Sequence, residues 1–216
     1  MLKECWWQLS ILILLSYFIS NFCGAVIISN YVIHKDIRKL GSKNPGTTNM
    51  ARVFGFKYGI VTFMIDCIKG FMCALIGKLI FASFFGNDVG TYAGYIAGLA
   101  VIIGHNYPVL LKFKGGKGFA SGIGIFLALA PGFTITLLLI GTVILVIIDR
   151  MSVCAMLFFL IEAIYHVIMF WNNNLWIPII TLVYFVLVVI AHRSNIERLI
   201  HGEEKKLGLI NRIKRK

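Results

Sequence analysis

Long apolar stretches separated by short polar segments run through the whole sequence. Seven stretches can be drawn, at residues 9–31, 58–85, 91–111, 119–130, 133–148, 153–170 and 176–191. A helix needs roughly 20 apolar residues to cross a bilayer, and several of these stretches reach that length. Only 14% of the residues are charged, against about 25% in a soluble domain, which excludes a soluble or disordered chain. We therefore predict an all-α polytopic integral membrane protein in which residues 1–216 form one domain.

Residues 119–148 pose a problem of length. One straight helix over this range would be about 45 Å long, whereas the hydrocarbon core of a bilayer is about 30 Å thick. Pro131 and Gly132 interrupt the run, and proline ends or kinks a helix. We predict two short helices here, which gives about seven transmembrane helices.

The positive charge is unevenly distributed. The chain carries a net charge of +12, and most of its 21 Lys and Arg residues fall in four places: residues 35–57, 112–117, 150 and 193–216. Lys and Arg mark cytoplasmic loops, so we predict a cytoplasmic membrane protein with its N-terminus outside and its C-terminus cytoplasmic. Orientation in the bilayer explains the basic charge without a nucleic-acid partner.

The first cytoplasmic segment, at residues 40–52, contains more than a positive loop needs. Besides lysine it gathers glycine, proline, hydroxyl and amide residues and an arginine: Gly41, Ser42, Asn44, Pro45, Gly46, Thr47, Thr48, Asn49 and Arg52. Hydroxyl and amide side chains donate hydrogen bonds to an anion, and the arginine fork matches a phosphate. An ordered turn that caps the next helix explains the composition equally well.

The second segment, at residues 104–119, places Lys114 and Lys117 around a glycine turn formed by Gly115, Gly116 and Gly118. A helix N-terminus with nearby lysines favours an anion. The turn is not a nucleotide-binding P-loop, because Leu111 stands where that motif needs its first glycine. A basic turn that sets topology explains the lysines but not the glycines beside them.

Two further polar pairs are spaced three residues apart. His192 and Asn195 follow the last apolar stretch and would share a helix face, although an amphipathic anchor explains a lone interfacial histidine at least as well. Asp66 and Lys69 lie inside an apolar stretch, where ionisable groups are costly and usually paired. We predict a mutual ion pair that supports the site. The His and Cys spacings indicate no metal, and no cofactor is predicted.

Taken together, the three segments resemble a known family. Residues 41–49 with Arg52, residues 104–118, and His192 to Asn195 with Glu204 are similar to the three signatures of the acyl-phosphate:glycerol-3-phosphate acyltransferases, the PlsY family. The resemblance implies transfer of an acyl group from fatty acyl phosphate to the sn-1 hydroxyl of glycerol 3-phosphate at the cytoplasmic face. The products are lysophosphatidic acid and phosphate, in the first step of bacterial phospholipid synthesis, with no obligate protein partner.

Residue roles follow from the same resemblance. The implied catalytic residues are Ser42, Arg52, Lys117, His192 and Asn195, and the implied substrate-binding residues are Asn44, Thr48, Asn49, Gly115, Gly116 and Gly118. Four positions depart from the family pattern, among them Thr47, where alanine is common, and Ala191, where arginine is frequent. Lys43 stands where the family usually has glycine, and a serine that the family tends to carry aligns with Val153, next to Ser152.

Two other classes of protein remain open from the residues alone. A small secondary transporter for a phosphorylated solute explains short broken helices and a glycine-rich anion site, but not the gathering of polar groups in cytoplasmic loops. A silent membrane scaffold gives no reason for the polar residues to occur together. An enzyme makes product in detergent, whereas a transporter needs a sealed vesicle.

Overall fold

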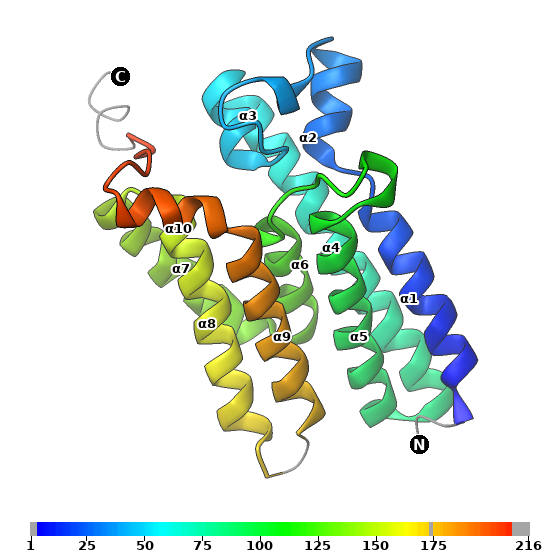
Figure 1. Ribbon diagram of the computed structural model, residues 1–216. Coiled ribbons are helices and arrows are strands. Elements are labelled where there is room, and N and C mark those ends of the chain that lie inside the picture. The colour runs from blue at the N-terminus through cyan, green and yellow to red at the C-terminus, as the bar shows by residue number, and fades with distance from the viewer. Residues whose placement is uncertain (1–3, 173–174, 209–216) are drawn as a thin grey trace. The chain divides into compact units, whose positions relative to one another are not determined.

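The computed structural model describes residues 4–172 and 175–208, and within these ranges it is helical without strands (Figure 1). The chain packs as two compact units, Met1–Ala130 and Pro131–Lys216. That the two units make one domain stays a prediction. The elements of the first unit are α1 (Trp6–Ser20), α2 (Gly24–Ile27), the π-helix η2 (Ile28–Val32), the 3₁₀ turn η3 (Ile37–Lys39), α3 (Thr47–Val53), α4 (Phe56–Phe85), α5 (Asn87–Asn106), the 3₁₀ turn η4 (Val109–Leu111) and α6 (Phe119–Leu129). Those of the second unit are α7 (Pro131–Ile148), α8 (Met151–Phe170), α9 (Trp176–Ala191) and α10 (Arg193–Ile200).

The first unit is organised around α4, which packs against α5 and α6. Glycines let these helices approach closely, as small residues do in membrane proteins. A Cβ at Gly124 of α6 would overlap the carbonyl oxygen of Cys67 in α4, and one at Gly70 of α4 would overlap that of Ser121 in α6. Backbone contact between α4 and α6 therefore fixes the direction in which the second polar segment enters α6.

The first apolar stretch is not one continuous helix, because α1 ends at Ser20 and α2 begins at Gly24. A break inside a membrane leaves backbone groups without partners. Lys69 Nζ donates to the carbonyl oxygens of Ser20 (3.2 Å) and Phe22 (3.1 Å), and the Gly24 N–H donates to Asp66 Oδ1 (3.3 Å). Lys69 and Asp66 also pair with each other at 2.8 Å. The predicted ion pair is confirmed, and it sits where the helix ends need a cation and an anion.

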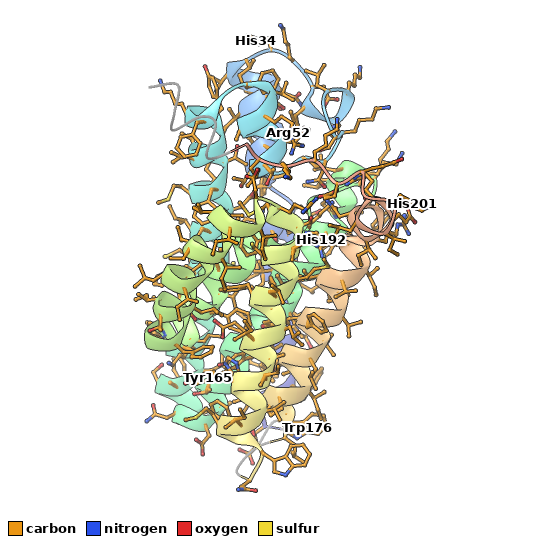
Figure 2. All side chains as sticks on the ribbon, turned by 90° about the vertical axis from the view of Figure 1, so that its left-hand side faces the viewer. His34, Arg52, Tyr165, Trp176, His192 and His201 are labelled. Atoms are coloured by element: carbon orange, nitrogen blue, oxygen red, sulfur yellow. The ribbon has the colours of Figure 1, made fainter. Side chains whose placement is uncertain are left out.

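The second unit pairs α8 with α9 and packs α7 on α8. In the interior, Thr134 of α7 donates its hydroxyl to Glu162 Oε1 of α8 at 2.9 Å. The helix axis bends by 61° between α9 and α10, and the bend is plain in Figure 1. Figure 2 shows His192 at the bend and Trp176 at the other end of α9.

Helices occupy all seven predicted apolar stretches, and the predicted split at Pro131 is confirmed, because α6 ends at Leu129 and α7 begins at Pro131. Their lengths are less uniform than expected. In the described part of the chain, five spans are long and apolar enough to cross a membrane, or six if α9 and α10 count as one bent span. With 11 residues, α6 is only about 16 Å long. Seven crossings and the sides of the two termini therefore stay predictions.

Candidate active site

The first polar segment is held in shape by the buried amide of Asn49. Its Oδ1 accepts the Ser42 N–H at 2.9 Å, and its Nδ2 donates to the Leu40 carbonyl at 3.0 Å. Gly41 has a φ of +59°, and a Cβ there would collide with Asn49 Oδ1. The side-chain amide of Asn49 therefore forms hydrogen bonds that close the loop. That Asn49 also contacts the substrate stays a prediction.

Arg52 lies in the last turn of α3 and is half-buried (Figure 2). Its guanidinium forms no hydrogen bond or ion pair with any residue that the structure describes. Arg38, in the same polar stretch, instead binds Asp36 at 3.0 Å, and its hydrogen bonds hold the pKa of that carboxyl below its usual range. Of these two arginines, Arg52 is the one that remains for an anion from outside the chain.

The remaining predicted side chains of this segment lie on or near the surface. Ser42 is exposed, and Asn44 and Thr48 are half-buried. Their hydroxyl and amide groups form no hydrogen bond with another residue in the described ranges. Within the described residues these three side chains do not hold the loop by hydrogen bonds, and their contact with substrate stays a prediction.

The glycines of the second segment fold the chain back onto the end of α5. The Gly115 N–H donates to the Asn106 carbonyl at 3.2 Å, and the Gly116 N–H donates to the His105 carbonyl at 2.9 Å. A Cβ at Gly115 would overlap the His105 carbonyl oxygen. These N–H groups were expected to face a phosphate, and the structure uses them within the chain. Their contact with substrate stays a prediction.

Side chains of the first helix anchor the beginning of this segment. Tyr17 Oη donates to the Tyr107 carbonyl at 3.0 Å and accepts the Val109 N–H at 3.1 Å. Asn21 Oδ1 accepts the Leu110 N–H at 3.1 Å. Sequence reasoning missed both anchors, because they lie inside an apolar stretch, although a polar residue in such a stretch is itself a signal.

Lys117 and Gly118 lead directly into α6. Gly118, with a φ of +81°, is the cap residue of this helix, and Lys117 just before it is half-buried. The free N–H groups at the start of a helix favour an anion, and a neighbouring ammonium adds to the attraction. The predicted position of Lys117 at a helix start is confirmed.

One apolar cluster brings the first two segments together. Met50 of the first segment and Ile37, which precedes this segment in η3, are buried in it, and Leu111 of the second segment packs against it. Cys23, at the break between α1 and α2, belongs to the same cluster and donates its thiol to the Pro45 carbonyl at 3.3 Å. Both segments therefore rest on one support within the first unit.

The third segment lies in the second unit, at the bend between α9 and α10. His192 is buried, and its Nδ1 lies 2.8 Å from the Val188 carbonyl oxygen. Because a carbonyl only accepts, Nδ1 carries the proton, and Nε2 is the acceptor of the neutral ring. His192 is the cap residue of α10 and Asn195 lies in its first turn. The His192 carbonyl accepts the Asn195 N–H at 2.8 Å, so the two residues belong to one turn, and the shared face stays a prediction.

A carboxylate that sequence reasoning assigned no role organises this segment. Glu204 accepts from Asn195 Nδ2 (2.6 Å), Ser152 Oγ (2.7 Å) and Arg198 Nε (2.8 Å). Burial alone would raise the pKa of Glu204, but these hydrogen bonds outweigh it and lower the pKa below its ordinary value. Ser152 therefore helps to hold Glu204, and Glu204 holds Asn195.

Metal ligation has no support in this geometry. Within residues 4–172 and 175–208, no group of three or more His, Cys, Asp or Glu side chains is placed to hold a metal ion. The expectation that the chain uses no metal or cofactor stays a prediction.

The comparisons with known proteins agree with one another. Residues 10–202 match the family model described as glycerol-3-phosphate acyltransferase. The chain belongs to this family. A glycerol-3-phosphate acyltransferase of Finegoldia magna is 38% identical over 200 residues, which cover 93% of this chain and 96% of that protein.

Two solved structures of family members are similar in fold. Both are crystal structures of PlsY, an integral membrane glycerol 3-phosphate acyltransferase. The glycerol 3-phosphate form has a TM-score of 0.84 at 29% identity and covers 95% of this chain and 98% of its own. The lysophosphatidic acid form has a TM-score of 0.79 at 28% identity, with 92% and 95% covered. This glycerol-3-phosphate acyltransferase is therefore a multi-pass membrane enzyme of phospholipid synthesis.

Proposed function

We propose that this acyltransferase moves an acyl group from a fatty acyl phosphate to the sn-1 hydroxyl of glycerol 3-phosphate, releasing phosphate and lysophosphatidic acid. The observation that carries the proposal is the guanidinium of Arg52, which has no partner in the described part of the chain while the nearby Arg38 is paired. The forms in which PlsY was crystallised, with glycerol 3-phosphate and with lysophosphatidic acid, support the acceptor and the product.

Acyl transfer from an acyl phosphate requires binding and alignment of the two substrates more than covalent catalysis by the enzyme. An acyl phosphate is a mixed anhydride with a good leaving group, so the enzyme must hold two phosphates and direct a hydroxyl at the carbonyl carbon. Arg52 and Lys117 offset the phosphate charge. Ser42, Asn44 and Thr48 add neutral hydrogen bonds from the first segment.

His192 and Asn195 are proposed to take part in the reaction because the resemblance to the family implies it. Because His192 Nδ1 is committed to Val188, the neutral ring accepts a hydrogen bond at Nε2, which suits the attacking hydroxyl better than a developing oxyanion. Asn195, fixed by Glu204, is proposed to contact the donor or the oxyanion. A phosphate oxygen of substrate is an adequate acceptor for the hydroxyl proton.

The test is phosphate release from palmitoyl phosphate by the purified chain in detergent, with and without glycerol 3-phosphate. Release that depends on glycerol 3-phosphate and is matched by lysophosphatidic acid supports the proposal. If folded protein releases no phosphate, the proposal is wrong and the transporter alternative is favoured. Activity of the purified chain alone also tests the expectation that it needs no cofactor or protein partner.

Arginine variants of the first segment sharpen this test. Arg52→Ala is expected to lose activity by about 100-fold or more, since a charge-assisted phosphate contact is lost, while Lys117→Ala behaves similarly. Arg38→Ala is the matched control, because Arg38 is already engaged by Asp36. Equal activity of the Arg52 variant and the control would remove the assigned role.

The sidedness is part of the proposal. We place the three polar segments on the cytoplasmic side and the N-terminus outside, on the strength of the positive charge of those segments. The basic tail extends to residues 209–216, which lie outside the described residues. A protease-sensitive tag at the N-terminus should be cut in right-side-out vesicles and protected in inverted ones, and the reverse pattern contradicts the assignment.

A further inference from the structure

A buried polar cluster in the first unit joins the helix break to the second polar segment. Lys69 Nζ lies 2.8 Å from Asp66 Oδ1 and 2.9 Å from His105 Nδ1. All three side chains are buried, with exposed fractions of 1% for Asp66, 8% for Lys69 and 4% for His105. Ionisable groups in a membrane span are costly, and they usually mark a functional arrangement. The ion pair explains the closing of the helix break, but it does not explain why a histidine completes the cluster.

The contact with Lys69 fixes the protonation pattern of the histidine ring. A lysine ammonium has donors and no acceptor, so His105 Nδ1 must be the acceptor in this contact. The neutral ring then carries its proton on Nε2. Asp66 and the carbonyl oxygens of Ser20 and Phe22 also accept from Lys69. The three N–H groups of the ammonium therefore serve four acceptors, with one N–H shared, and the other contacts hold Lys69 in place beside Nδ1.

The other edge of the His105 ring lies against the glycine turn. A Cβ added at Gly116 would overlap His105 Nε2, and the Gly116 N–H donates to the His105 carbonyl at 2.9 Å. The residue therefore contacts the turn through both its ring and its backbone. Lys117 follows Gly116 directly, so the orientation of the His105 ring affects the position of the Lys117 ammonium group.

We propose that Lys69 and His105 are positioning residues for the second segment: Lys69 orients the His105 ring, and the ring sets the place of Gly116 and so of Lys117. The phosphate-bearing substrate that Lys117 holds is then bound through a chain of contacts that begins at the break between α1 and α2. The expected effect on catalysis rests on the proposed function. The structural claim, that Lys69 orients the His105 ring, rests only on the contacts within the cluster.

The first experiment reads the protonation pattern of the His105 ring directly. Nitrogen NMR of ¹⁵N-histidine-labelled protein in detergent, with the His105 signals assigned by the loss seen in His105→Gln, reports which ring nitrogen carries the proton. The proposal expects the Nε2–H tautomer in the wild-type protein and a mixture with Nδ1–H in Lys69→Met. An Nδ1–H ring in the wild-type protein, or an unchanged tautomer in folded Lys69→Met, overturns it.

The second experiment measures catalysis. Lys69→Met is expected to raise the KM for at least one phosphate substrate about tenfold while kcat changes less than about threefold, because ground-state placement of an anion-binding group is lost. Lys78→Met is the matched control: it lies on the same helix, and its ammonium forms no bond within the described residues. An unchanged KM in folded Lys69→Met overturns the proposal.

Removing Lys69 leaves Asp66 buried without its cation, which is strongly destabilising, so the variant also has to be checked for folding. Gly116→Ala gives an independent route, because it keeps both Lys69 and Asp66 and its Cβ acts on the His105 ring from the side of the turn. It is expected to give the same KM effect and to perturb the His105 nitrogen signals; wild-type values for both overturn the proposal. If the wild-type protein has no acyltransferase activity, the proposed function is wrong. The tautomer measurement then still tests whether Lys69 orients the His105 ring.

Discussion

The two units hold their predicted site residues by different chemistry. In the first unit, neutral groups contact both polar segments directly: the amide of Asn49, backbone carbonyls, and glycines that leave no room for a Cβ. The charged Asp66–Lys69 pair reaches the second segment through His105. In the second unit, a carboxylate gathers three donors, and Asn195 depends on the charge of Glu204. The first arrangement should be sensitive to added volume, and the second to charge and pH.

Added volume should have the largest effect in the second segment. Gly115→Ala places a Cβ on the His105 carbonyl oxygen, so the turn must shift, and a small misplacement of catalytic groups costs about 100-fold in rate. Gly141→Ala in α7 is the control, since nothing lies within 4 Å of its added Cβ. Steady-state rates of the two purified variants make the comparison, and a fully active Gly115→Ala would show that the turn is not sterically fixed.

Charge should matter most at Glu204. Glu204→Gln keeps the shape but loses charge-assisted hydrogen bonds, which should lower the free energy of unfolding by about 2–3 kcal/mol. The neighbouring Glu203 is exposed, so Glu203→Gln is the control, and thermal unfolding at neutral pH measures both. Equal melting temperatures would mean that Glu204 does not organise the second unit.

The same residue predicts a pH dependence. The folded-state pKa of Glu204 is lowered from its ordinary 4.5, so its stabilisation is present above that value and is lost as pH falls through the folded pKa. Melting temperatures of wild type and Glu204→Gln should therefore converge in acid. A gap that does not shrink as the pH falls below 4.5 would contradict this linkage.

Two asparagines of the first segment have different expected roles: Asn49 stabilises the loop, and Asn44 binds substrate. Asn49→Ala removes buried hydrogen bonds and should lower the free energy of unfolding by about 1–2 kcal/mol. Asn44→Ala should leave stability unchanged, because its amide has no partner within the described residues, and should act on activity alone. Chemical unfolding in detergent measures the difference, and loss of stability in both would blur the distinction.

The smallest effect is expected at Lys43. This residue has a φ of +61°, a left-handed conformation that is costly for a residue with a side chain and easy for glycine. Lys43→Gly should stabilise the first segment by about 0.5–1 kcal/mol, measured as a small rise in melting temperature. A fall would mean that the lysine side chain contributes a contact of its own.

Much of the fold follows from local sequence, and the exceptions have distant causes. The apolar stretches predict the long helices, and Pro131 predicts the split between α6 and α7. The break between Ser20 and Gly24 was not predicted, because residues 9–31 read as one apolar run. Its partners, Asp66 and Lys69, lie on another helix, so only the folded chain shows why the break is tolerated.

The sequence predicted which residues belong to the candidate site, but not the structural role of each one. Polar groups stand out in an apolar chain, and the family they indicated is confirmed. Residue type alone does not separate Asn49 from Asn44, or Glu204 from Glu203. The difference comes from burial and hydrogen bonds, and these depend on how the segments fold over their supports.

The outer surface of α7 makes the surrounding amphiphile part of the folded state. Leu139, Val143 and Ile147 repeat every four residues with exposed fractions of 68%, 61% and 77%, and only 11% of this span is buried. Such a stripe is solvated by acyl chains in a bilayer and by detergent tails after extraction. Detergents with short tails should therefore loosen α7 before any other long helix, and the choice of detergent will set how long the purified enzyme keeps its second unit intact.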